Sequence, residues 1–102
     1  TGNPIGIQQT STEVPSGFEL SQNYPNPFNP ATNIKISVPK SEFIRLSVYD
    51  VTGKEVAALV NEKLSAGVYN VDFNASELSS GVYFYRLTSG SFTEVKKMML
   101  VK

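Results

Sequence analysis

Prolines occupy three of six consecutive positions in one stretch of this chain, at Pro25, Pro27 and Pro30. Each ring fixes φ at about −65° and removes a backbone donor, so neither a helix nor a strand ladder can continue through the stretch. The residue before each proline is pushed toward extended geometry. Tyr24 and Phe28 stand on this stiff backbone, and we expect both aromatic rings to pin the segment onto a hydrophobic core.

Apolar and polar residues alternate directly after the prolines. Ile34, Ile36 and Val38 fall on one side of the segment 32–38, which Pro39 closes. Alternation with a period of two predicts a half-buried strand. We expect this strand to lie at the edge of a sheet.

A second alternating segment, 43–50, leads into a turn. The four residues DVTG at 50–53 place Asp first and Gly fourth, which is typical of a type I turn. We expect Gly53 to take a left-handed conformation in a bulged hairpin. The return segment, 55–60, breaks the alternation, which leaves a bulged strand or a short helix; a bulged strand is favoured.

A six-residue pattern occurs twice, as LSAGVY at 64–69 and LSSGVY at 78–83. In each copy a leucine closes the end of the core and a glycine, Gly67 or Gly81, permits a positive φ. A tyrosine, Tyr69 or Tyr83, then enters a strand, as in the tyrosine corner of immunoglobulin-like sandwiches. The side chains expected to point inward along the two strands are those of Tyr69, Val71 and Phe73, and of Tyr83, Tyr85 and Leu87.

The segment 92–101 is rich in Val, Met and Leu and predicts the last strand. Its core-facing pair is ambiguous, and Met98 with Leu100 is favoured over Met99 with Val101. Lys96 and Lys97 would protect the strand against pairing with other chains if it lies at an edge. Turn signals between about 7 short strands indicate an all-β fold, an immunoglobulin-like antiparallel β-sandwich.

Residues 1–17 are rich in Gly, Pro, Ser, Thr and Gln, which predicts a flexible linker from an upstream domain, with the folded domain at 18–102. Nine basic and nine acidic residues give zero net charge, which argues against nucleic acid or an anionic membrane as the main partner. We expect no transmembrane segment and no signal peptide in this chain.

His and Cys are absent, which removes the common general base, the thiol nucleophile and the best transition-metal ligands. Asp72 and Glu77 could contribute to a calcium site, but no acidic loop pattern supports one. We therefore expect no enzyme activity, no cofactor and no metal. Phe43, Tyr49 and Phe84 are expected to pack against a second sheet, with an exposed platform for sugar rings as the alternative.

Several segments together resemble the type A C-terminal sorting domains of the type IX secretion system (Por secretion), found in Bacteroidetes and related bacteria. LSQNYPNPFNPAT at 20–32 is similar to the opening of that family, and VYDVTGKEV at 48–56 to its first hairpin. GVY at 67–69 and GVYFYRL at 81–87 look like its two Gly-x-Tyr motifs, and KKMMLVK at 96–102 looks like its terminal strand. The similarity covers about 18–102, and an immunoglobulin-like module of the flagellar hook-capping protein shares the general pattern. The residues that mark the fold are Tyr24, Pro25, Asn26, Pro27, Phe28, Asn29, Pro30, Gly53, Gly67 and Tyr69.

The resemblance implies a non-catalytic signal that directs a larger protein from the periplasm through the outer-membrane translocon, to be secreted or held on the cell surface. It implies an upstream cargo domain in the same chain and a sortase-like peptidase that cuts in the linker at 1–17, often with attachment of the cargo to lipopolysaccharide. The residues expected to be recognised by the translocon are Gly81, Tyr83, Lys96, Lys97 and Lys102.

Two other interpretations stay open. A β-sandwich accessory module would bind polysaccharide or pack on an upstream enzyme, and it would show an exposed aromatic strip. An assembly module would form oligomers. We expect the chain to end directly after its last strand, which favours the sorting interpretation.

Overall fold

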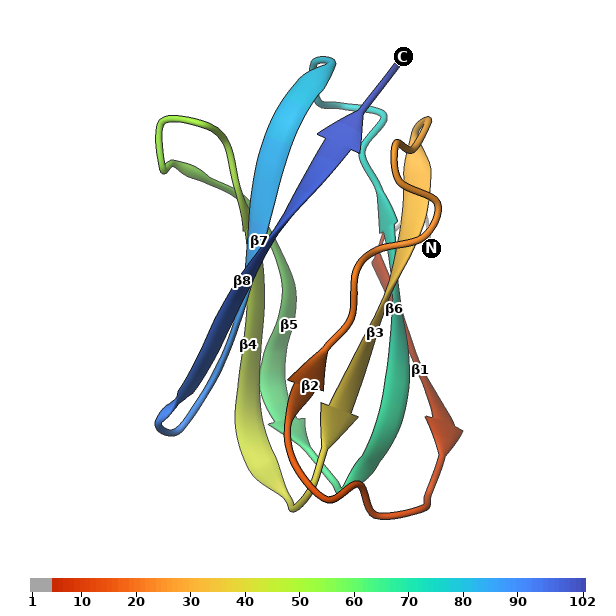
Figure 1. The fold of residues 1–102 in the computed structure, drawn as a ribbon, viewed down its shortest axis with the longest axis vertical. Helices are drawn as coiled ribbons and strands as arrows, with labels where there is room; N and C mark the ends of the chain where they lie inside the picture. The colour runs from red at the N-terminus through yellow and green to blue at the C-terminus, as the bar shows by residue number, and fades with distance from the viewer. Residues whose placement is uncertain (1–4) are drawn as a thin grey trace.

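Two antiparallel sheets of four strands each pack face to face in this computed structural model, which describes residues 5–102 (Figure 1). The predicted antiparallel β-sandwich is confirmed, with eight strands, one of which has only two residues. No helix occurs in the described part of the chain. The strands are β1 (Ile5–Ser11), β2 (Glu19–Leu20), β3 (Ala31–Val38), β4 (Glu42–Tyr49), β5 (Glu55–Leu64), β6 (Gly67–Asn74), β7 (Gly81–Ser89) and β8 (Phe92–Leu100).

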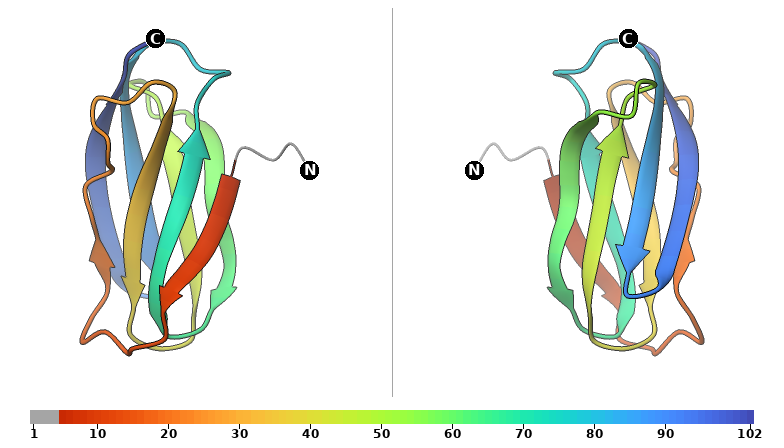
Figure 2. Two further views of the ribbon diagram at one scale, coloured as in Figure 1. Left: turned by 90° about the vertical axis from the view of Figure 1, so that its right-hand side faces the viewer. Right: turned by 90° about the vertical axis from the view of Figure 1, so that its left-hand side faces the viewer.

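One sheet has the order β1-β6-β3-β2 and the other has the order β5-β4-β7-β8, and Figure 2 shows them from their two sides. We call them sheet A and sheet B. The alternating segments of the sequence supply their facing sides, so the predicted inward residues of β6 and β7 are all buried. Met98 and Leu100 are buried on β8, as favoured, while Met99 is exposed.

The N-terminal segment is a strand over much of the length that the sequence assigns to a linker. β1 pairs with β6 from Ile5 opposite Phe73 to Ser11 opposite Val68. The expectation of a flexible linker at 1–17 is therefore wrong for Ile5–Ser11, and residues 1–4 lie outside the described range. The edge of β6 offers a free row of backbone donors and acceptors. A polar segment can pair with this edge through its backbone, even when its composition is typical of a linker.

Gly67 is the point where β1 comes closest to the rest of sheet A. A Cβ atom built on Gly67 would stand 2.6 Å from the carbonyl oxygen of Ser11 and would also overlap Nε2 of Gln9. The φ of Gly67 is +151°, a conformation that side chains disfavour. Only glycine therefore allows β1 to lie at this distance.

We expect Gly67→Ala to push the end of β1 away from β6 and to lower the free energy of unfolding by about 1–3 kcal/mol, through overpacking and backbone strain. Hydrogen exchange of the backbone amides of β1 measures the displacement. Gly17→Ala is the control, because a Cβ there meets nothing within 4 Å. Equal protection of β1 in both variants would contradict the role given to Gly67.

Both copies of the repeat form the predicted tyrosine corner. Tyr69 donates its hydroxyl hydrogen bond to the Ser65 carbonyl oxygen, and Tyr83 donates to that of Ser79, each at 2.7 Å. The glycine before each tyrosine has a φ of +151°. The prediction for the two corners is confirmed.

The hairpin between β4 and β5 also agrees with the sequence. The Gly53 amide donates to the Asp50 carbonyl oxygen at 3.0 Å, and Gly53 has a φ of +89°. β5 is a strand with two register irregularities against β4, so the bulged strand is confirmed over the short helix.

The proline-rich stretch joins the two sheets along one side of the sandwich. Tyr24 pairs with Asn33 of sheet A, while the Phe28 amide donates to the Met99 carbonyl oxygen at 3.0 Å and the Val101 amide donates to that of Phe28 at 2.9 Å. The Phe28 ring is 2% exposed and lies in the core, whereas Tyr24 is 81% exposed. The expectation that both rings pin the stretch is therefore wrong for Tyr24, which pairs at an outward-facing position.

The strand after the prolines is internal, not at an edge as expected. β3 pairs with β6 on one side and, through Glu19 and Leu20, with β2 on the other. Phe18, just before β2, stacks on Phe92 with ring centroids 5.2 Å apart. Phe18 and β2 are thus part of the fold, at the position where the sequence predicts that the folded domain begins.

Candidate recognition surface

The two lysines predicted for recognition at Lys96 and Lys97 point to opposite faces of β8. Lys97 lies opposite Phe84 on the outer face of sheet B and is exposed. Lys96 lies opposite the buried Tyr85, and its ammonium group is 3.3 Å from the Glu94 carboxylate. The pair therefore offers one outward ammonium group and one that is held by an acidic neighbour.

The other three predicted residues lie together at the start of β7. Tyr83 is buried in its corner, and Gly81 pairs with Leu100 on β8. The Lys102 amide donates to Oγ of Ser80 at 3.0 Å, and its ammonium group donates to the carbonyl oxygens of Ser76 and Leu78 at 2.8 and 2.7 Å. Lys102 thus ties the chain after β8 to the connector that precedes β7.

Exposed apolar side chains gather on the outer face of sheet B and along β8. Val95 and Met99 are about half exposed on β8, at alternate positions that bracket Lys97. Phe43 on β4 is exposed as well. Aromatic residues on this face do not pack against a second sheet, so that expectation is wrong for Phe43, Tyr49 and Phe84.

Arg86 joins the aromatic residues of this face. Its guanidinium group donates to the Tyr49 hydroxyl at 2.7 Å and stands over the Tyr49 ring, 4.8 Å from the centroid. Tyr49 also lies opposite Phe84 across the β4–β7 ladder. With Val95 and residues of the 50–53 turn, these side chains line a shallow depression of about 340 Å³.

The turn beside this depression is stabilised by Asp50. The Asp50 carboxylate accepts hydrogen bonds from the Thr52 hydroxyl at 2.6 Å and from the backbone amides of Thr52 and Lys54 at 2.9 and 3.1 Å. The Thr52 hydroxyl bond is the main cause that lowers the pKa of Asp50, followed by the amide of Lys54. The carboxylate is therefore charged and engaged within the turn.

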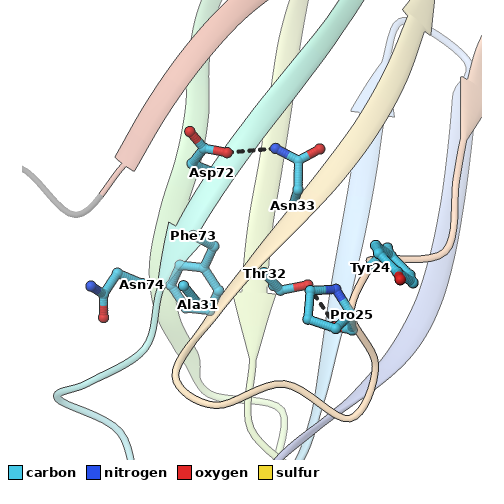
Figure 3. Close-up of a pocket in the computed structure, with 8 residues that line it drawn as sticks. All are labelled: Tyr24, Pro25, Ala31, Thr32, Asn33, Asp72, Phe73 and Asn74. Atoms are coloured by element: carbon cyan, nitrogen blue, oxygen red, sulfur yellow. Dashed lines mark hydrogen bonds between the residues drawn. The ribbon is translucent and has the colours of Figure 1, made fainter.

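The outer face of sheet A differs in character. The exposed Tyr24 ring borders a hollow of about 480 Å³ there, which is drawn in Figure 3. Asn33 donates a hydrogen bond to Asp72 across β3 and β6, and both side chains line the hollow with Asn74. Apart from Tyr24 and the small Ala31, the exposed positions paired across these strands are polar.

Within residues 5–102, no three His, Cys, Asp or Glu side chains are grouped in a way that could hold a metal ion. Asp72 and Glu77, the weak calcium candidates, belong to no such group. None of the described elements is a helix that could cross a membrane.

A family model described as a secretion system C-terminal sorting domain matches residues 22–102. The chain belongs to this family. A search of curated protein sequences finds no match. The matched range begins between β2 and the proline-rich stretch, and it includes both tyrosine corners and β8. β1 and β2 precede the matched range.

The sorting domain is a C-terminal signal for type IX secretion, and proteins that carry it are secreted or attached to the cell surface. Its partner is the type IX secretion machinery. The resemblance stated from the motifs is confirmed. The sequence did not single out Val95 beside Lys97, although apolar residues on both sides of Lys97 at alternate positions indicate that the three side chains share one face.

Proposed function

We propose that the outer-membrane translocon recognises the folded sorting domain on the outer face of sheet B. The surface consists of Phe84, Arg86, Val95, Lys97 and Met99, and we call it the β8 face. The observation that carries the proposal is the concentration of exposed apolar and cationic side chains there, while the outer face of sheet A, apart from Tyr24 and Ala31, exposes polar residues.

The composition of the β8 face suits a protein partner. Aromatic residues, Met and Arg are enriched in protein interfaces, and exposed apolar groups that lie together mark interaction sites on soluble domains. The Arg86 guanidinium is already ordered by Tyr49, so little side-chain entropy is lost when a partner packs against it. Lys97 supplies a charge that steers an acidic partner and keeps two sorting domains from pairing edge to edge.

In the same proposal, Lys102 and Tyr83 hold the geometry of the face, while Lys97 contacts the partner. Lys102 fixes the connector through Ser76 and Leu78, and the Tyr83 corner fixes the start of β7. The domain contributes binding and no catalysis. Of the other two residues predicted from sequence, Gly81 pairs with Leu100 and has open space where a side chain would stand. Lys96 is engaged in the ion pair with Glu94.

The proposed cleavage by a sortase-like peptidase falls at 12–17. Among the described residues of the predicted linker, only this stretch lies outside a strand, and most of it is exposed. A peptidase needs an extended, accessible backbone, which strands paired in a sheet do not offer. The cargo domain would lie upstream, and its release or attachment to the cell surface would follow the cut.

We expect Lys97→Glu combined with Met99→Glu to lower export about tenfold while the thermal midpoint changes little, because both side chains are exposed. The measurement is the fluorescence of a periplasm-directed fluorescent protein fused to residues 1–102, compared between medium, cell surface and periplasm. Lys35→Glu, an exposed lysine on the outer face of sheet A, is the control. Equal export by both variants would show that the translocon does not read the β8 face.

A further inference from the structure

The two copies of the repeat give the domain two equivalent corners, at Gly67 and at Gly81. In both, the glycine has a φ of +151° and the tyrosine two residues later donates to a carbonyl oxygen at 2.7 Å. Each following strand also has a full-length neighbour: β3 pairs along β6, and β8 pairs along β7. Each of these two strands also has a second edge, which faces away from that neighbour. The second edge of β6 beside Gly67 can therefore be compared with the second edge of β7 beside Gly81.

At the first corner, the other flank is filled by β1. The Ser11 carbonyl oxygen comes within 2.6 Å of the position that a Cβ of Gly67 would take. The Gln9 side-chain amide donates to the Ala66 carbonyl oxygen at 3.2 Å, and the Thr10 hydroxyl donates to that of Val68 at 3.3 Å. The glycine and its neighbours thus form a seat for an extended backbone.

At the second corner, the other flank is open. β4 pairs with β7 only as far as Tyr49 opposite Phe84, because the chain then turns back at 50–53, where the Asp50 amide donates to the Lys54 carbonyl oxygen at 2.9 Å. A Cβ built on Gly81 would meet no heavy atom within 4 Å. Figure 1 shows this turn leaning away from the start of β7.

The equivalence of the flanks follows from the order of the sheets. β3 and β8 lie on the side of the sandwich that the proline-rich stretch closes, through Tyr24 with Asn33 and Phe28 with Leu100. The opposite flank of β6 holds β1, and the opposite flank of β7 holds β4. The vacant stretch at Gly81–Tyr83 therefore corresponds to the stretch of β6 on which the end of β1 is seated.

We propose that the open flank of Gly81–Tyr83 receives an extended segment of a type IX component, which adds to β7 as a strand. This rests on the proposed function, since the partner is the same machinery. Strand addition uses backbone hydrogen bonds for affinity and pockets at alternate side chains for specificity. The occupant has a small or polar residue beside Gly81, as β1 has beside Gly67, and an apolar residue over the depression that Val51 and Phe84 border.

The two glycines at the ends of β7 provide the test. Gly81 and Gly90 have φ values of +151° and +58°, and a Cβ on Gly90 would come no closer than 3.6 Å to another group. Alanine therefore imposes backbone strain at both positions, but only at Gly81 would it fill the seat. In the export assay with residues 1–102, we expect Gly81→Ala to reduce export at least fivefold and Gly90→Ala to reduce it less than twofold, at similar thermal midpoints. Equal export by the two variants would overturn the proposal.

A second pair of variants covers the case in which Gly81→Ala does not fold. Val51 is exposed on the 50–53 turn and lines the depression beside Phe84, where the apolar residue of the occupant is proposed to lie. Val51→Trp therefore fills this depression without disturbing the core, while Val51→Ala leaves it open. We expect the tryptophan variant to lose export at least threefold and the alanine variant to retain it. If both export normally while the Lys97→Glu and Met99→Glu variant does not, the β8 face stands and strand addition is wrong. If all of them export normally, the proposed function fails as well.

Discussion

Phe28→Ala is expected to lower the free energy of unfolding by about 3–5 kcal/mol, the usual cost of deleting a buried aromatic ring. The ring is 2% exposed and lies 6.4 Å from the Phe73 ring, centroid to centroid. The backbone of Phe28 also joins Met99 and Val101 through two hydrogen bonds, so loss of the ring loosens the contact between the proline-rich stretch and β8. Urea titration followed by far-UV circular dichroism measures the change.

Tyr24→Ala is the matched control, because it removes an aromatic ring from the same stretch. Tyr24 is 81% exposed, so its loss is expected to change the free energy of unfolding by less than about 0.5 kcal/mol. A similar cost for the two variants would contradict the assignment of Phe28, and not Tyr24, as the anchor of the stretch.

Tyr85→Phe is expected to destabilise the domain by about 1–3 kcal/mol for each polar group that it leaves unpaired. The Tyr85 hydroxyl accepts a hydrogen bond from the backbone amide of Asn23 and donates one to the Ser21 carbonyl oxygen, both at 2.8 Å. The Tyr85 side chain is fully buried. Phenylalanine keeps the packing and removes both bonds. The same urea titration measures this loss, and Tyr24→Phe, which alters an exposed hydroxyl, is the control.

The same residue predicts a pH dependence. Burial raises the pKa of Tyr85 to about 12, from 10.0. The unfolded chain loses this proton near pH 10 while the folded domain retains it, so the unfolded state binds fewer protons between these values. The contribution of Tyr85 is therefore complete below pH 10 and falls as the pH rises toward 12. The stability difference between the wild type and Tyr85→Phe should shrink across this range, and a constant difference would contradict the burial of the hydroxyl.

Local patterns were sufficient for most of the sandwich. Period-two alternation identified β3 and β4, and the repeated LSxGVY pattern identified both tyrosine corners before either hydrogen bond was visible. β1 was missed because its Gly, Gln and Thr content is typical of a linker, and its stability comes from the edge of β6 and the space at Gly67. Such a contact joins segments about 60 residues apart, which local composition does not reveal.

The candidate site was predicted less completely than the fold. Neighbouring residues of a strand point to opposite faces of the sheet, so the assignment of a strand already places the side chains of Lys96 and Lys97 on opposite faces. Which of the two faces outward depends on the pairing of β8 with β7. Nothing in the sequence indicated the buried hydrogen-bond network around Asn23. The side-chain amide of Asn23 donates to the Thr32 hydroxyl and to the Pro25 carbonyl oxygen. Polar contacts of this kind depend on how the proline-rich stretch crosses between the sheets.

Export of a passenger protein is the most direct test of the central claim that this domain is a type IX secretion signal. A periplasm-directed fluorescent protein fused to residues 1–102 would be expressed in a host with a working type IX translocon and in one without it. We expect fluorescence at the cell surface or in the medium only when the translocon works, and only when Lys96–Lys102 are present. Fluorescence that stays in the periplasm of both hosts, with the domain folded, would contradict the claim and would favour a β-sandwich accessory module.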